Sequence, residues 1–221
     1  NQLIHYKGHG YADAATKKPM QADAIFRIMS QSKAITSLAI LQLFEQGKLQ
    51  LDQPIYQFIP EFKSPTVLNN FNMADSSYST LPAKREITFR DLLTHTSGID
   101  YSGIGSDKMK AIYAKAGIPS GLGESKDKLL EKMKLLGKLP LVHQPGEKFT
   151  YGLNTDLLGC LVEIISGQSL EAYMNEHIFE PMGMKDTYFN VPMDKISRLP
   201  AVYTEDKNKQ IIPWAPTFRG I

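Results

Sequence analysis

A serine and a lysine three residues apart are the clearest chemical feature of the chain. Ser30 and Lys33 form an S-x-x-K pattern just before the apolar run 34–44. Residues three apart on a helix share one face, with about 5–6 Å between their Cβ atoms, so the lysine ammonium can reach the serine hydroxyl. A serine at a helix start also lies at the positive end of the helix dipole, which favours the charge that develops during acyl transfer. The pattern predicts a nucleophile, Ser30, with Lys33 as its base.

The S-x-x-K pattern is short, and it occurs a second time at Ser125 and Lys128. The second copy lies in a charged, glycine-flanked stretch, where serine ordinarily caps a helix. The run after Ser30 is apolar on nearly all sides, which predicts a helix buried within a domain. A lysine that enters such a helix must be paired or shifted toward its neutral form. The alternative for this copy is a capping serine beside a lysine that extends its ammonium to solvent.

Composition excludes several other chemistries. The 25 basic and 23 acidic residues are mixed along the chain, so we expect no surface for nucleic acid or membrane, and no apolar run reaches the ~18 residues of a membrane span. The single cysteine, Cys160, lies among apolar residues and excludes thiolate metal sites and C-x-x-C redox chemistry. The chain has no H-E-x-x-H pair, no G-x-S-x-G elbow and no glycine-rich phosphate loop. Serine chemistry with a lysine base remains.

Turn and cap signals define the elements that would position these groups. Gly47 ends the helix that follows Ser30, as glycine commonly does. Thr88 and Asp91 have the spacing of a capping box and begin another helix. His95 falls in the last turn of that helix, where a structural role at the helix dipole and a catalytic role both stay open. Periodicity and turn residues predict strands over 3–7, 201–204 and 210–214, an irregular stretch over 64–85, and helices within 107–138, over 155–166 and from Ser169 to before Pro181.

Five stretches carry a family resemblance: FRIMSQSK at 26–33, EQGKLQLD at 45–52, ITFRDLLTHTSG at 87–98, YGLNTDLLG at 151–159 and FEPMGMKDT at 179–187. Together they resemble the serine β-lactamase-like hydrolases of the class C type, which include penicillin-binding D-alanyl carboxypeptidases and family VIII carboxylesterases. The resemblance implies an α+β fold of the β-lactamase/transpeptidase type, with an antiparallel sheet flanked by helices and a mostly helical subdomain. It divides the chain into 1–50, with the nucleophile helix, 51–180, mostly helical with the tyrosine motif, and 181–221, which returns toward the α/β subdomain.

The second motif of this family, usually Y-x-N, supplies a tyrosine that takes the serine proton and returns it to the leaving group. Tyr151 matches it by position, with Leu153 where the motif has asparagine. A phenol with a pKa near ~10 becomes a usable base when a cation such as Lys33 stabilises its phenolate. The resemblance implies that Ser30, Lys33 and Tyr151 are catalytic and that Leu153 and Asn154 bind substrate. This form of the motif looks more like the carboxylesterase branch.

The third motif of the family, K-x-G or H-x-G on a later strand, is not found after Tyr151. In the family that strand supplies the second N–H group that binds the oxyanion. We therefore expect that C-terminal strands are missing from this chain, and that either the chain is part of a longer protein or a partner chain completes the sheet.

The expected function is that of a serine hydrolase that forms an acyl-enzyme on a small-molecule ester, amide or lactam, with esterase activity favoured. One alternative is D-alanyl carboxypeptidase or β-lactamase activity. Another is a non-catalytic member of the fold that binds cell-wall peptide. The reaction needs no metal and no organic cofactor, and the expected partners include no nucleic acid and no membrane. The resemblance favours a periplasmic or secreted location, and the sequence does not define the oligomeric state.

Overall fold

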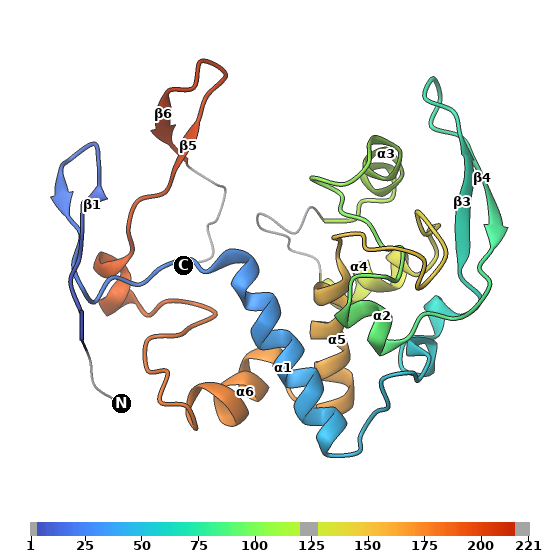
Figure 1. Cartoon of the computed structure of the whole chain (residues 1–221), viewed down its shortest axis with the longest axis horizontal. Helices are drawn as coiled ribbons and strands as arrows, with labels where there is room; N and C mark the ends of the chain where they lie inside the picture. Colours follow the sequence, from blue (N-terminus) through green and yellow to red (C-terminus); the bar gives the residue numbers. More distant parts are fainter. Residues whose placement is uncertain (1–3, 120–127, 215–221) are drawn as a thin grey trace. The chain divides into compact units, whose positions relative to one another are not determined.

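The computed structural model describes residues 4–119 and 128–214, which form two compact units (Figure 1). The larger unit is Ser30–Met182, and the smaller unit combines Asn1–Met29 with Gly183–Ile221. The domain boundaries that the sequence predicts after residues 50 and 180 stay a prediction. All three predicted catalytic residues belong to the larger unit, so its fold is what positions them.

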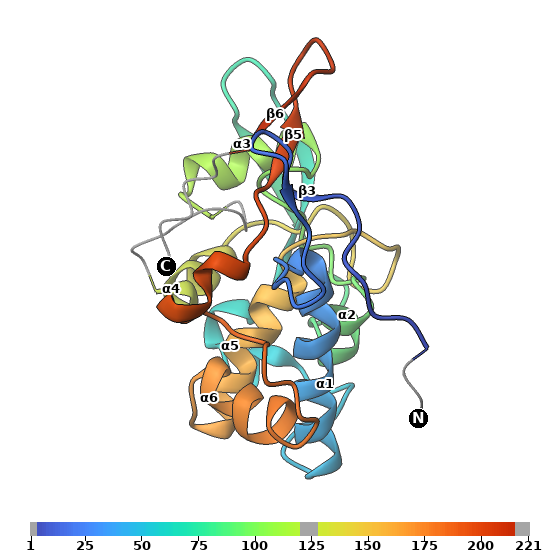
Figure 2. The same cartoon turned by 90° about the vertical axis from the view of Figure 1, so that its left-hand side faces the viewer.

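Two helices, α1 and α5, lie side by side in the larger unit and pack against each other (Figure 1 and Figure 2). α1 covers Ser32–Glu45 and ends, as predicted, just before Gly47, whose φ of 70° suits glycine. α5 covers Asn154–Ser166, close to the predicted 155–166. The buried side chains at the centre of this unit include Ala39, Ile40, Leu43, Leu157, Leu158 and Leu161. Removing this apolar surface from water holds the two helices together.

The first helix is less buried than its sequence predicts. Leu38 and Leu41 of α1 are 39% and 41% exposed. The run is apolar on nearly all sides, but in the part of the chain that the structure describes only the face carrying Ala39, Ile40 and Leu43 is fully covered. The S-x-x-K pattern therefore stands at the start of a half-buried helix.

Shorter helices surround this pair. α2, α4 and α6 all contact α5. Helices predicted within 107–138 are observed as two, α3 and α4, and the second S-x-x-K copy begins at Ser125, outside the described residues. The remaining bounds are α2 Phe89–Leu93, α3 Asp107–Lys115, α4 Leu129–Leu136, α6 Leu170–Met174, a π-helical turn Asn175–Phe179, and 3₁₀ turns Met29–Gln31, Ile55–Gln57 and Pro60–Phe62.

A β-hairpin occupies the stretch that was expected to be irregular, and that expectation was wrong. β3 (Thr66–Phe71) pairs antiparallel with β4 (Tyr78–Pro82), from Thr66 opposite Pro82 to Phe71 opposite Tyr78. Every residue of β4 is exposed. A strand with no buried face needs no alternation of apolar and polar residues, so the usual sequence signal is missing.

The smaller unit contains two short strand pairs. β1 (Tyr11–Asp13) pairs with β2 (Lys18–Pro19), and β5 (Tyr203–Glu205) pairs with β6 (Ile211–Pro213). The second pair confirms the strands predicted near 201–204 and 210–214. The strand predicted over 3–7 was wrong for residues 4–7, where Ile4 is 92% exposed and lacks a sheet to pack against. A 3₁₀ turn, Met193–Arg198, completes the unit.

The mixture of helices and antiparallel strand pairs confirms the predicted α+β class. Within residues 4–119 and 128–214 the strands form three two-stranded sheets. No helix of this part of the chain has the length and apolarity needed to cross a membrane.

Candidate active site

Ser30, Lys33 and Tyr151 come together at one point of the larger unit. The Ser30 hydroxyl lies 2.7 Å from the Tyr151 hydroxyl, and the Lys33 ammonium donates a hydrogen bond of 3.3 Å to Ser30 Oγ. Lys33 Nζ also lies 5.0 Å from the centroid of the Tyr151 ring. A cation beside a phenol stabilises its phenolate form, and a phenolate in contact with a serine hydroxyl can take the serine proton.

The three groups meet because two helices begin near one another. Ser30 lies in the 3₁₀ turn that leads into α1, Lys33 is the second residue of α1, and Tyr151 precedes α5 by three residues. The residue before Ser30, Met29, has a φ of 48°, which a residue with a Cβ seldom adopts. Such a strained backbone is typical of functional positions, and here it directly precedes Ser30, the predicted nucleophile.

Two neighbouring tyrosines have different acidities. Burial raises the pKa of Tyr151, but hydrogen bonds with Lys33 and Ser30 outweigh burial, and its pKa lies below the ordinary value. Burial raises the pKa of Tyr101 to about 12, and the negative charges of Asp156 and of ionised Tyr151 add to this increase. Two groups whose pKa values are moved apart by their environments in this way are suited to different roles in acid–base chemistry. Tyr151 is the phenol that can act as a base, and Tyr101 stays protonated.

The ring of Tyr151 is held by other rings. Tyr101 stacks on it with centroids 5.7 Å apart and planes 11° from parallel. His95 stacks on it at 5.2 Å and 23°, and Phe149 lies 5.7 Å from His95. Offset stacking of this kind stabilises each pair by about 0.5–1.5 kcal/mol beyond area burial. The plane of the phenol is therefore fixed before any substrate binds.

Leu153 and Asn154, predicted to bind substrate, are fully buried. The Asn154 amide accepts a hydrogen bond of 2.6 Å from the Ser97 hydroxyl and lies 3.0 Å from Nδ1 of His95. Their assignment as substrate-binding residues stays a prediction. The burial and the engaged amide favour a supporting role for Asn154 behind Tyr151.

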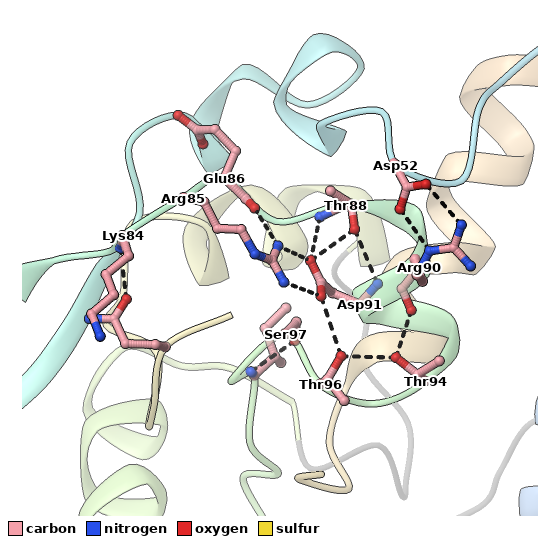
Figure 3. A network of polar contacts seen from close by, with 12 residues as sticks. Asp52, Lys84, Arg85, Glu86, Thr88, Arg90, Asp91, Thr94, Thr96 and Ser97 are labelled. Carbon is pink, nitrogen blue, oxygen red and sulfur yellow. Dashed lines mark hydrogen bonds and ion pairs between the residues drawn. The ribbon is translucent and has the colours of Figure 1, made fainter. Parts of the chain in front are cut away.

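A buried carboxylate organises the chain that leads to His95 (Figure 3). Asp91 is 4% exposed and accepts two hydrogen bonds from Arg85, of 2.6 and 2.8 Å, and two from the backbone and hydroxyl of Thr88. This confirms the predicted capping box of α2. Burial opposes ionisation of Asp91, but the bonds from Arg85 and Thr88 prevail and its pKa lies below the ordinary value. Thr96 also donates to Asp91, so the carboxylate ties the start of α2 to the loop after it.

A pocket of about 430 Å³ opens beside Tyr151. Its wall includes Asp100, whose carboxylate accepts bonds from the Ser106 backbone and hydroxyl and from the Tyr101 backbone. That volume lies within the range of small-molecule sites. Other residues of its lining are Ile104, Gly105, Val142, Lys148 and Thr150. In the described ranges, no three or more His, Cys, Asp or Glu side chains are grouped to hold a metal ion.

Sequence reasoning missed part of this arrangement. Tyr101 and Ser97 were not singled out, and the position of His95 differs from the expected last helical turn. His95 follows the C-cap residue Thr94 and has a φ of 55°. A polar run directly after a capped helix, THTSG at 94–98, is the signal that could have directed attention to this loop.

Comparison with known proteins identifies the family. The model of the family described as Beta-lactamase matches residues 1–217. The chain belongs to the β-lactamase family. The resemblance drawn from its motifs and the fold type that they imply are thereby confirmed.

The relatives of this chain include esterases and uncharacterised proteins. An uncharacterised protein of Mycobacterium tuberculosis is 36% identical over 210 residues, which are 95% of this chain and 50% of that protein. Esterase EstB of Burkholderia gladioli is 34% identical over 191 residues, which are 85% of this chain and 44% of the esterase. The solved structure of EstCE1, described as a hydrolase with promiscuous acyltransferase activity, has a TM-score of 0.76 at 30% identity and covers 93% of this chain and 49% of that one. The chain spans about half the length of the curated relatives it matches.

Proposed function

We propose that the protein is a serine hydrolase that acts on small carboxylic esters through an acyl-enzyme on Ser30. One observation carries the proposal, namely the 2.7 Å contact between the hydroxyls of Ser30 and Tyr151 with Lys33 3.3 Å from the same serine oxygen. The names of two relatives, an esterase and a hydrolase with acyltransferase activity, support it.

The geometry supports a two-step reaction. Tyr151, as a phenolate stabilised by Lys33, takes the proton of Ser30 while Oγ forms a bond to the ester carbonyl carbon. When the tetrahedral intermediate collapses, the carbon–oxygen bond to the alcohol breaks and Tyr151 returns the proton to that alcohol. Water then gives its proton to Tyr151, attacks the acyl-enzyme and releases the acid, and the proton goes back to Ser30.

The negative oxygen of the tetrahedral intermediate needs hydrogen-bond donors. The backbone N–H of Ser30 is suited to this task, because the first N–H groups of a helix lack partners within the helix. We expect the second donor from a part of the protein outside this chain. The pocket of about 430 Å³ beside Tyr151 would receive one side of the substrate.

The test uses the complete protein with three substrates: a short-chain nitrophenyl ester, a chromogenic cephalosporin and a peptide ending in D-Ala-D-Ala. Turnover is expected to be fastest with the ester. A fluorophosphonate probe should add one adduct, found on Ser30 by intact and peptide mass. Ser30→Ala should abolish labelling and turnover. Ser32→Ala is the matched control, because Ser32 lies two residues away as the first residue of α1, and it should keep both.

The alternatives predict different outcomes. Preferred cleavage of the cephalosporin or the D-Ala-D-Ala peptide would show that the protein is a β-lactamase or a peptidase rather than an esterase. Saturable binding of the peptide with no adduct and no turnover would favour a binding protein. Turnover that survives Ser30→Ala would show that the nucleophile is wrong.

A further inference from the structure

His95 touches the segment around Tyr151 with both its backbone and its side chain. Its carbonyl accepts a hydrogen bond of 2.8 Å from the N–H of Thr150. Its ring stacks on the Tyr151 ring with centroids 5.2 Å apart. Its Nδ1 accepts a hydrogen bond of 3.4 Å from the N–H of Gly152 and lies 3.0 Å from Nδ2 of Asn154. The residues on either side of Tyr151, and the phenol itself, thus all rest against one histidine.

The hydrogen bonds define which nitrogen of His95 carries the proton. A backbone N–H can only donate, so Nδ1 must offer its lone pair to Gly152. Asn154 must then present its NH₂ group to Nδ1, which leaves its oxygen for the Ser97 hydroxyl 2.6 Å away. The Ser97 oxygen in turn accepts a bond of 3.0 Å from the N–H of Ile99. Every donor in this chain of bonds meets an acceptor when His95 is neutral with its proton on Nε2.

The histidine acts from an uncommon backbone position. His95 has a φ of 55°, in the left-handed region that most residues avoid. The Asp91 network holds the residue that follows His95, since the Thr96 hydroxyl donates to the Asp91 carboxylate (Figure 3) and the Thr96 N–H donates to the Asp91 carbonyl. A strained position held by surrounding bonds is commonly retained for function.

We propose that His95 is a positioning residue that, in its neutral Nε2–H form, holds the Tyr151 hydroxyl at hydrogen-bonding distance from Ser30. The inference rests on the proposed function for its kinetic consequences. An imidazolium would place a proton on Nδ1 against the donors of Gly152 and Asn154. Burial and the charge of Lys33 both lower the pKa of His95, in keeping with the neutral form. Three other groups face His95, and none of them carries a positive charge. They are the Asn154 amide from α5 and the rings of Phe149 and Tyr151 from the segment before α5.

Two substitutions separate the two contacts of His95 in the complete protein. His95→Asn keeps an acceptor near Nδ1 and tolerates the positive φ, but it removes the ring. His95→Phe keeps a ring and removes the acceptor. Each should lower kcat on the nitrophenyl ester by about 10- to 100-fold with little change in KM, because a displaced catalytic group costs rate rather than binding. His177→Asn and His177→Phe are the matched controls. The His177 carbonyl accepts a hydrogen bond from the side chain of Gln42, which lies on α1 ten residues after Ser32. These two variants should leave kcat unchanged.

A pH profile provides a readout that loss of stability alone would not move. In Asn154→Asp the donor that faces Nδ1 becomes an oxygen, which favours a proton there and raises the pKa of His95. On acidification, the Asn154→Asp variant should therefore lose its activity at a higher pH than the wild type does. Nitrogen-15 spectra should show Nδ1 of wild-type His95 without a proton and Nε2 with one.

The inference and the proposed function fail in different ways. If Ser30→Ala abolishes turnover but both His95 variants keep the wild-type kcat, the inference is wrong and the proposed function stands. If turnover survives Ser30→Ala, the proposed function fails, and crystal structures of the folded His95 variants decide the inference by themselves. A Ser30–Tyr151 distance that stays at 2.7 Å in both variants would overturn it, and a lengthened distance would support it.

Discussion

The hydroxyl of Tyr151 lies 2.7 Å from Oγ of Ser30, although 121 positions of the chain separate the two residues. The elements α1 and α5 pack against each other, and the ring of His95, from the loop after α2, stacks on the tyrosine. Under the proposed function the reaction would therefore depend on three separate elements of the larger unit, and each can be tested by itself.

Removal of the Tyr151 hydroxyl should slow the reaction strongly without unfolding the protein. Tyr151→Phe keeps the ring that stacks on Tyr101 and His95 but has no group to take the Ser30 proton. We expect kcat to fall by about 100-fold or more, as for loss of a general base. Ester hydrolysis measures the rate and thermal unfolding measures stability. Tyr56→Phe is the control and should change neither, and a Tyr151→Phe enzyme of wild-type rate would contradict the role of the phenol.

Lys33 should set the pH range of activity. Burial raises the pKa of Tyr151, and the hydrogen bond from Lys33 is the larger of the two bonds that lower it below its ordinary value. Lys33→Gln removes the cation, so the pKa of Tyr151 rises and less phenolate exists at any given pH. The alkaline rise of kcat/KM should move to higher pH, and the rate at pH 7 should drop by about tenfold or more. Lys48→Gln serves as the control, and an unshifted profile in Lys33→Gln would speak against this coupling.

The buried Asp91 should matter far more to stability than an exposed carboxylate close by. Asp91→Asn weakens the paired bonds with Arg85 and should cost about 2–3 kcal/mol of unfolding free energy at pH 7. Asp52 pairs with Arg90 at the surface (Figure 3). The matching change, Asp52→Asn, should lower the free energy of unfolding by less than about 1 kcal/mol. Urea unfolding measures both. Equal costs for the two variants would contradict the prediction.

The same carboxylate predicts a dependence of stability on acid. The pKa of Asp91 is lower in the folded protein than in the unfolded chain, so its contribution is present above the ordinary aspartate pKa of ~3.9. That contribution is lost as the pH falls through the lower, folded-state pKa. The difference in stability between the wild type and Asp91→Asn should therefore shrink below about pH 4. A difference that stays constant down to pH 2 would show that the ionised form is not what stabilises the fold.

Gly152 should tolerate no side chain. A Cβ at this position would collide with the backbone carbonyl of Ile99, so Gly152→Ala must displace the segment that carries Tyr151. We expect a loss of kcat of about 100-fold. Gly47→Ala is the control, because a Cβ there meets no atom and only the φ of 70° is unfavourable. It should cost about 1 kcal/mol of stability and leave the rate of the folded enzyme unchanged.

Local features of the site follow from the sequence more readily than distant ones. The spacing of Ser30 and Lys33 predicts their contact because both lie within one helical turn. The role of Tyr151 was predicted from the family resemblance alone, because no local pattern indicates a partner that far along the chain. The polar run THTSG at 94–98 marks the loop of His95, but the contacts of His95 with Tyr151 could not be predicted, because they depend on which distant residues pack against that loop. The hairpin of β3 and β4 was missed for a related reason, as its exposed strand carries no apolar pattern.

The pocket beside Tyr151 is built largely from residues other than those that handle the proton of Ser30. Its lining includes Ile104, Val142 and Lys148, while the hydroxyl of Ser30 contacts Lys33 and Tyr151. Under the proposed function, exchange of lining residues would alter which substrates fit while the contacts of Ser30 stay unchanged. Such a division would let the substrate range of the protein change by single substitutions that each leave the Ser30 contacts in place.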